Sequence, residues 1–462
     1  MSVTLLPATE QLSLLRRRAI TPLELAEEHI RQIQRLNPKL NALVDFDADR
    51  VCTLAQQVRS GPLAGLPVTV KSSIATAGYR CEIGSTLLRG QIPEKNAVVV
   101  DRLLAAGAVL LGTTNCPEFL MAYETENLLC GSTRNPWNLE YSAGGSSGGE
   151  SAAIAGGLSA GGLGSDSGGS VREPAHFTGI CALKPTPGRI PGAGHLPPCL
   201  GPFNFLGAIG PMARTVGDLA LFFEVLSGQD PTDPASPPVP YQEVSPEDAK
   251  RVPIGFFEDD GVMPVTRETR VAVQAAAEAL ERRGFTVRPF RPAALEAARR
   301  LWWTFFVQCG AMLYAPTIRG REEELSRTFR DFLEIARTET PLTGESLLNA
   351  WVASDQVRAQ LLEEMREFPI LLCPVCSIPA FRPFERSWMV EGQSVAYLDA
   401  MRYAQWFNLL GAPAAVVPVS QSPEGLPIGV QIAGRPFADE LVLSVAAAVE
   451  AEFGYRPPPI AF

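Results

Sequence analysis

The sequence predicts an α/β fold into which a layer of helices is inserted. Short apolar runs that are typical of buried strands recur along the chain, and stretches with helical periodicity alternate with them. One block, from about residue 294 to 368, is mainly helical and lies between two strand-forming halves. The chain has no short repeat, so a core of strands and helices with an inserted helical layer is the simplest architecture.

The N-terminal part supplies helices and strands in turn. A helix is expected to begin after Thr21, where T-P-L-E forms a capping box with proline at the first helical position, and to stop at Asn37-Pro38. The run LAGLPVTVK predicts a strand that carries Lys71 at its end. Residues 97–107 predict a helix, and the run AVLLGTTN after it predicts a strand.

The middle of the chain is dominated by a Gly/Ser-rich tract over residues 142–170. After it, ICALKP predicts a strand, and Thr215 to Asp218 predicts a capping box for a helix that Gly228 ends. A Pro-rich surface connection follows, DPTDPASPPVPYQEVSPED.

In the C-terminal half, VPIGFF and FTVRPF predict strands on either side of a helix over 267–283. The helical block then contains a cluster of four aromatic residues, Trp302, Trp303, Phe305 and Phe306. Beyond it, PILLCPV, AAVVPVS and PIGVQIA predict strands, and a last helix is expected over 441–450.

Composition argues against several classes of protein. Hydrophobic residues make up 46% of the chain, enough for a sizeable core. Fifty acidic against 40 basic residues give a net charge of −10, and the chain has no Lys/Arg cluster of the kind that neutralises phosphates. Nucleic acid is therefore not an expected partner. The first residues lack the order of a secretion signal, and no apolar run reaches about 18 residues, which predicts a cytoplasmic protein with no membrane partner.

The nine cysteines are scattered and odd in number, unlike a disulfide framework. Cys373 and Cys376 form one C-x-x-C inside an apolar run, without a second pair or a redox context. They are therefore predicted to be two buried thiols. No metal site and no cofactor are expected.

Three motifs carry the chemistry: GLPVTVK ending at Lys71, SAGGSSGGE around Ser146, and GSDSGGSVR around Ser170. Each alone is a weak signal. Together, in this order and at intervals of 75 residues from Lys71 to Ser146 and 24 from Ser146 to Ser170, they resemble the amidase signature family, whose members hydrolyse amide bonds with a Lys, cis-Ser and Ser triad. Further matching segments are TTNCPEF at 113–119, TRNPWN at 133–138, ALKPTPGR at 182–189, GPMARTVGDLAL at 210–221 and the stretch from FNLLGAPA to GLPIGVQIAGRPF at 407–437.

The resemblance implies one amidase-signature domain over residues 1–462, with a large central mixed β-sheet covered by helices on both faces. Within it we expect N-terminal helices over 1–60 and a catalytic core with the Ser/Gly-rich motif over 61–230. A helical insertion over 290–368 is a candidate cap for the site, and residues 369–462 complete the core.

By the same resemblance, Ser170 is the nucleophile, Ser146 the proton relay and Lys71 the base, and the peptide bond before Ser146 is cis. A serine hydroxyl is a poor nucleophile at neutral pH and needs an adjacent proton acceptor. Lysine can accept a proton only when it is neutral, and burial disfavours its charged form. The hydroxyl of Ser146 can donate to one partner while it accepts from the other, which suits a relay.

The residues before the nucleophile can turn successive backbone N–H groups toward one point and so form an oxyanion hole. The predicted oxyanion-hole residues are Ser167, Gly168, Gly169 and Ser170. Asp166 is expected to anchor this loop by accepting backbone hydrogen bonds, and Arg172 to brace the site through an ion pair.

Substrate contacts also follow from the resemblance, which implies that Leu120, Met121, Ala122 and Tyr123 line the acyl pocket. The Trp302–Phe306 cluster either roofs this pocket or is ordinary core. We therefore expect bulky, apolar or aryl amides as substrates. Carbamates (urethanes) and esters are also expected, since all pass through a similar tetrahedral oxyanion.

Three positions depart from the family pattern. Ser72 follows the lysine where the family usually has Asp, which leaves the support of the lysine open. Glu173 and His176 stand where small or apolar residues are more usual.

Other interpretations remain open at this point. G-x-S-x-G around Ser146 also fits the nucleophile elbow of α/β-hydrolases, but that fold needs an acid and then a His near the C-terminus, and only His29, His176 and His195 exist. The family also includes the glutaminase subunit of a tRNA-dependent amidotransferase, which works bound to partner proteins. An inactive binding protein on the same fold is disfavoured by the complete triad, and homodimerisation is left open.

Overall fold

The computed structural model describes residues 2–198 and 201–461. Its centre is a mixed sheet of eleven strands in the order β1-β3-β2-β4-β6-β5-β12-β13-β9-β7-β8. The strands are β1 (Leu43–Phe46), β2 (Pro67–Lys71), β3 (Val109–Thr114), β4 (Gly161–Asp166), β5 (Cys181–Lys184), β6 (Ala208–Ala213), β7 (Ile254–Phe256), β8 (Val287–Pro289), β9 (Ile370–Pro374), β12 (Ala414–Gln421) and β13 (Pro427–Gly434). A separate hairpin pairs β10 (Ser387–Val390) with β11 (Gln393–Ala396).

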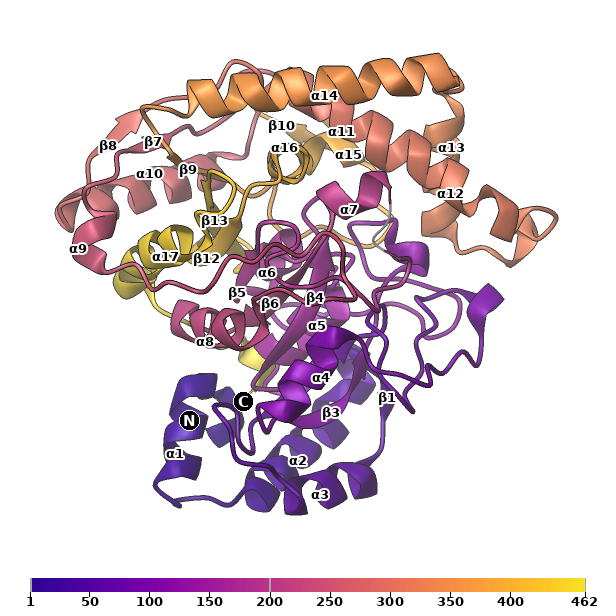
Figure 1. Cartoon of the computed structure of the whole chain (residues 1–462), viewed down its shortest axis with the longest axis vertical. Helices are drawn as coiled ribbons and strands as arrows, with labels where there is room; N and C mark the ends of the chain where they lie inside the picture. Colours follow the sequence, from indigo (N-terminus) through magenta and orange to yellow (C-terminus); the bar gives the residue numbers. More distant parts are fainter. Residues whose placement is uncertain (1, 199–200, 462) are drawn as a thin grey trace.

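Helices cover this sheet and extend beyond it (Figure 1). They are α1 (Ala8–Arg16), α2 (Pro22–Leu40), α3 (Ala48–Gln56), α4 (Val98–Ala105), α5 (Gly148–Ala155), α6 (Arg172–Thr178), α7 (Pro202–Leu206), α8 (Val216–Leu226), α9 (Pro246–Ala249), α10 (Arg267–Arg282), α11 (Leu295–Trp303), α12 (Cys309–Ile318), α13 (Arg327–Arg337), α14 (Gly344–Glu364), α15 (Tyr397–Ala400), α16 (Arg402–Leu410) and α17 (Asp439–Phe453). A single π-helical turn, Thr304–Gln308, joins α11 to α12.

The direction of the strands brings three strand ends together. β2 runs parallel to both of its neighbours, β3 and β4, and Lys71 is paired with Thr114 at the end of β3. β4 ends at Asp166, immediately before the segment that carries Ser170. Because the carboxyl ends of parallel strands lie at one edge of a sheet, loops that follow them commonly build a site there.

Side chains alternate between the two faces of β2. Val68 and Val70 belong to the large apolar core that α4, α8, α10 and α17 share with the sheet. Thr69 points the other way and donates a hydrogen bond to Glu150 of α5. Lys71 has the same parity as Thr69, so the alternation directs it to the face that α5 covers.

The mainly helical block expected over 294–368 is present as α11 to α14, at the top of the view in Figure 1, on the side away from α1 to α3. It has its own core with α16, to which Trp302, Phe305, Phe329 and Trp406 contribute. The predicted strands at β2, β3, β5, β7, β8, β9, β12 and β13, and the helices at α4, α10 and α17, are also confirmed.

Two local predictions were wrong in detail. The helix from Thr21 continues through Pro38 to Leu40. Proline is tolerated here because, this close to the end of the helix, it removes only one intrahelical hydrogen bond. The Asn37 side chain also accepts hydrogen bonds from the N–H groups of Ala42 and Leu43, just after the helix. Thr215 caps α8, but the box is not reciprocal: the Asp218 carboxylate accepts from the backbone N–H groups of Ala8 and Thr9 at the start of α1.

The expectations from the sequence also concerned two cysteines and membrane-spanning helices. Cys373 and Cys376 are buried free thiols, as predicted, and Cys376 Sγ donates to the carbonyl of Ile378. Across the described ranges, the helices are either too short or too polar to cross a membrane.

Candidate active site

Lys71 lies at the end of β2 with its side chain fully buried. Its Nζ lies 2.6 Å from Ser146 Oγ, 3.0 Å from Ser147 Oγ and 3.2 Å from Ser165 Oγ. Burial lowers the pKa of Lys71 to about 8, because the charged ammonium loses its hydration. Three hydroxyls therefore surround an amine that is partly neutral near pH 8.

Ser146 stands just before the N-terminus of α5, and the peptide bond between Gly145 and Ser146 is cis, as the resemblance implied. The backbone is tightly enclosed here. A Cβ atom at Gly145 would come within 2.5 Å of the carbonyl oxygen of Ala122. Glycine at this position thus lets the chain place Ser146 against Lys71.

Ser170 and Ser146 line the same cavity, together with Ser165 and Ser167. The carbonyl oxygen of Ser170 accepts a hydrogen bond from the N–H of Ser147, at 3.1 Å, which ties the two serine segments together. The structure thus brings the three residues of the predicted triad to one place. Ser147 and Ser165, which the sequence motifs did not single out, complete the surroundings of the lysine.

The loop before Ser170 only partly fits the predicted oxyanion hole. The N–H of Gly169 donates to Asp166 Oδ1 at 2.8 Å and is therefore not available to a substrate in this structure. Among the described residues, no hydrogen bond engages the N–H groups of Ser167, Gly168 and Ser170. These three are the remaining candidate donors.

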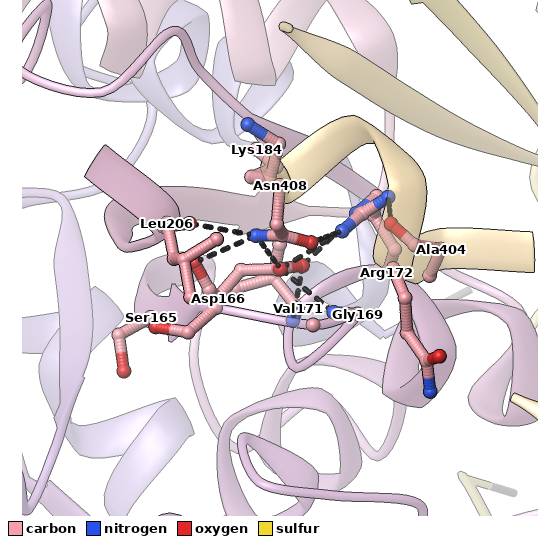
Figure 2. A network of polar contacts seen from close by, with 12 residues as sticks. Ser165, Asp166, Gly169, Val171, Arg172, Lys184, Leu206, Ala404 and Asn408 are labelled. Atoms are coloured by element: carbon pink, nitrogen blue, oxygen red, sulfur yellow. Dashed lines mark hydrogen bonds and ion pairs between the residues drawn. The ribbon is translucent and has the colours of Figure 1, made fainter. Parts of the chain in front are cut away.

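Asp166 and Arg172 form a buried ion pair beside this loop (Figure 2). Arg172 donates through Nε and Nη2 to the two carboxylate oxygens, at 3.0 and 2.9 Å, while Asp166 also accepts from the N–H of Val171. Asn408 of α16 bonds both partners. Burial alone would raise the pKa of Asp166, but the Arg172 guanidinium holds it below its usual range.

A second buried acid, Glu150, lies on the face of the sheet that carries Lys71. It accepts hydrogen bonds from Thr69 and from Thr114, at 2.5 and 2.8 Å. Burial raises the pKa of Glu150 to about 7, although both hydroxyl contacts act in the opposite direction. No sequence pattern singled it out, because its partners come from two different strands.

Of the residues expected to line the acyl pocket, Leu120 and Met121 line the cavity. Ala122 and Tyr123 are outside its lining, and Tyr123 instead donates to the carbonyl of Gly168. The backbone φ is positive at Phe119 and Leu120, the two residues before Met121. Further lining residues are Phe119, His195, Pro197, Phe203, Phe306 and Tyr314.

The aromatic cluster of the insertion contributes in two ways. Phe306 lines the cavity, whereas Trp302 stacks on Phe306 with ring centroids 4.7 Å apart and is fully buried. Phe305 packs into the core of the insertion, and the indole N–H of Trp303 donates to Glu339. The cluster therefore contributes both to the lining of the cavity and to the core of the insertion.

The three departures from the family pattern have distinct surroundings. Ser72 lies 3.3 Å from Cys116 Sγ and provides no carboxylate beside the lysine. Burial raises the pKa of Glu173 well above its usual range, and its carboxylate has no hydrogen-bond partner among the described residues. His176 is held by the carbonyl of Ile378 and by the backbone of Gly429.

The nucleophile-elbow interpretation finds no support in these contacts. Both ring nitrogens of His29 and of His176 bind groups outside the cavity, and His195, which lines it, binds Ser73 and the carbonyl of Pro197. Within the described residues, Ser146 has a lysine and not a histidine as its basic partner.

The chain is similar to known proteins over most of its length. Residues 24–443 match the Amidase family model. The chain is 32% identical to an indoleacetamide hydrolase of Bradyrhizobium diazoefficiens, over 97% of this chain and 86% of that protein. It is also 33% identical to one subunit of the glutamyl-tRNA(Gln) amidotransferase of Roseiflexus sp. (strain RS-1), over 94% of each chain.

Among solved structures, a bacterial aryl acylamidase of the amidase signature family superposes with a TM-score of 0.86 at 26% identity and covers 96% of both chains. The match to the family model, the identity to the relatives and the eleven-stranded mixed sheet support the same family. The chain therefore belongs to the amidase signature family and is a hydrolase of C–N amide bonds.

Proposed function

We propose that this enzyme hydrolyses amides with an apolar or aryl acyl group through a Lys71–Ser146–Ser170 triad. The observation that carries the proposal is the 2.6 Å contact between the buried amine of Lys71 and Ser146 Oγ, on the wall of a cavity that Ser170 also lines. A neutral amine in this position can withdraw a proton through Ser146 from the attacking hydroxyl.

The reaction follows from these groups. Ser170 Oγ attacks the substrate carbonyl while its proton passes to Ser146 Oγ, and the proton of Ser146 passes to Lys71 Nζ. Collapse of the tetrahedral intermediate breaks the C–N bond, and the departing nitrogen takes the proton back along the same route. Water then attacks the acyl-enzyme with the same assistance and releases the acid and Ser170.

Negative charge on the substrate oxygen would be met by the N–H groups of the loop before Ser170. Those of Ser167, Gly168 and Ser170 are the candidates, since Asp166 holds the N–H of Gly169. Asp166 and Arg172 would act on the reaction only through the position of this loop. Their role is thus structural in the proposal, as the sequence suggested.

The lining of the cavity supports the choice of acyl group. Phe119, Leu120, Met121, Phe203, Phe306 and Tyr314 surround the serines. We propose that the helical insertion caps the site, since Phe306 and Tyr314 both come from it. A glutaminase subunit would need groups to bind a charged amino acid, and the lining described here includes no carboxylate, guanidinium or ammonium side chain. Carbamates and esters remain within the proposal because they share the tetrahedral oxyanion.

Substrate preference can be measured directly with a panel of anilides, aryl-acyl amides, aliphatic amides, carbamates and esters, with glutamine included. We expect kcat/KM for aryl-acyl amides to exceed that for glutamine by about 100-fold or more, since one buried aromatic ring contributes about 3 kcal/mol. Comparable or higher turnover of glutamine would contradict the proposed acyl pocket. It would favour the alternative, a glutaminase that works within an amidotransferase.

Activity should also depend on pH in a direction that the lysine sets. With a pKa of about 8, Lys71 carries an extra proton below that pH and cannot act as a base. We expect kcat/KM to rise about tenfold per pH unit up to about pH 8 and then to level off. A pH profile of the hydrolysis of a neutral aryl amide tests this.

The matched control for that profile is His195→Gln, because His195 is the one titratable basic side chain among the described residues that line the cavity. Burial lowers the pKa of His195 to about 4. The pH range over which kcat/KM rises should therefore be the same in this variant as in wild type. A rise that moved or vanished in His195→Gln, or a wild-type profile flat from pH 6 to 9, would exclude Lys71 as the titrating base.

A further inference from the structure

We propose that Trp302 and Tyr123 are positioning residues of the oxyanion hole, each holding one peptide unit of the 167–169 loop by its carbonyl oxygen. The proposal rests on the proposed function, because it assigns a task to the loop before Ser170. It also gives the helical insertion a part in catalysis beyond covering the site.

Trp302 acts on the first of the two peptide units. Its indole Nε1 donates to the carbonyl of Ser167 at 2.8 Å, although the two residues belong to segments far apart in the chain. The indole is fully buried and stacks on Phe306, with the ring planes 13° apart. Its N–H therefore has a fixed direction.

Tyr123 acts on the second peptide unit. Its hydroxyl donates to the carbonyl of Gly168 at 2.9 Å and accepts from Gln405 Nε2 of α16 at 3.1 Å. Tyr123 is buried, and its own N–H donates to the hydroxyl of Tyr397. Hydrogen bonds in such a chain polarise and strengthen one another.

Both residues also limit the space around the loop. A Cβ atom at Gly168 would lie 2.5 Å from Cζ2 of Trp302 and 3.1 Å from the hydroxyl of Tyr123. Gly168 thus sits between the indole and the phenol. The two side chains fix the backbone there by contact as well as by hydrogen bonds.

The planarity of the peptide bond links these contacts to the hole. The carbonyl of one residue and the N–H of the next belong to one rigid plane and point in opposite directions. A donor on the Ser167 carbonyl therefore orients the N–H of Gly168, and a donor on the Gly168 carbonyl orients the N–H of Gly169.

The two peptide units are held unequally. The second has a partner at both ends, Tyr123 on its carbonyl and Asp166 on its N–H. The first has Trp302 on its carbonyl, and no hydrogen bond in the described parts of the chain engages the N–H of Gly168. This N–H is available to donate a hydrogen bond to the substrate oxyanion, and the hydrogen bond from Trp302 to the Ser167 carbonyl sets its direction.

The support of Trp302 comes from α11 as a whole. Glu296 of α11 forms an ion pair with Arg402 of α16, and Arg299 pairs with Asp399 at 2.5 Å. These contacts fasten α11 to the segment that also carries Gln405. The insertion and α16 together therefore set the geometry of the loop.

The test separates binding of the transition state from binding of the substrate. An aryl boronic acid forms a tetrahedral adduct with a serine nucleophile and so reports on the oxyanion hole. For Trp302→Phe we expect kcat to fall and the Ki of the boronic acid to rise, both by about 10- to 100-fold, with KM for the matching amide within about threefold. Tyr123→Phe, which keeps the ring, should change both quantities in the same direction but less.

Trp303→Phe is the matched control, since it removes an indole N–H from the same helix that donates to Glu339 at 2.9 Å and not to the loop. Equal effects of Trp302→Phe and Trp303→Phe on the Ki would overturn the proposal. A rise in KM with an unchanged Ki would do so too. Failure of the triad itself has another signature: turnover that persists in Ser170→Ala.

Discussion

Ser170→Ala should lower kcat by a factor of about 10⁴ to 10⁶, with KM little changed. The substitution removes the atom that attacks the carbonyl, and the remaining rate enhancement comes from binding and from the oxyanion hole alone. The side chain lost is small and lies in a loop, so the thermal midpoint should stay near that of wild type. Steady-state turnover of an aryl amide gives the comparison.

Ser151→Ala is the control for this variant. Ser151 is also buried, but its hydroxyl donates to the carbonyls of Ala143 and Gly148 and lines no part of the cavity. Intact mass measurement after mixing with an activated ester should show an acyl adduct in wild type and in Ser151→Ala but none in Ser170→Ala. An adduct that persists in Ser170→Ala would instead support the nucleophile-elbow mechanism.

Local sequence signals predicted much of the frame around this site. The strand that ends at Lys71 is short and apolar, and its alternation explains why Thr69 and Lys71 share a face. The block of helices over 294–368 followed from periodicity. These signals lie within a few residues of the features that they predict, so no knowledge of tertiary contacts was needed.

The strand β4 could not be predicted from such local signals. Its sequence, GGLGSD, would be a poor strand by propensity, since glycine weakens a strand interior. Tertiary packing explains the glycines: a Cβ atom at Gly162 would lie 2.1 Å from Glu150 Oε1, and one at Gly164 would lie 2.7 Å from Ser147 Oγ. α5 and the residues that surround Lys71 therefore require a strand with almost no side chains.

The contacts of Tyr123 and Trp302 could not be predicted from the sequence either, for a different reason. Tyr123 was expected to line the acyl pocket, and the cluster with Trp302 either to roof it or to be ordinary core. Each instead donates a hydrogen bond to a backbone carbonyl of the loop before Ser170. Trp302 is 135 positions from its partner in the chain, and an aromatic cluster carries no mark of what its polar atoms bind. Only the fold shows which face of such a residue meets the loop.

Removing the guanidinium in Arg172→Met should produce the largest loss of stability, about 3 to 5 kcal/mol in the free energy of unfolding. The change would leave the Asp166 carboxylate buried without its counter-charge, and Asn408 and Gln431 without a donor. Unfolding in urea, followed by tryptophan fluorescence, measures the loss. Since Asp166 also holds the N–H groups of Gly169 and Val171, turnover should fall as well, even at temperatures where the variant is folded.

Arg366→Met is the control, because Arg366 pairs with Glu363 on the surface, where both side chains are more than 70% exposed. Such pairs contribute about 0 to 1 kcal/mol, so this variant should be close to wild type in stability and in turnover. The two arginines differ in burial and not in charge. A loss below about 1 kcal/mol in Arg172→Met would mean that water reaches Asp166 once the guanidinium is gone, and that the anchor of the oxyanion loop is not a buried ion pair in solution.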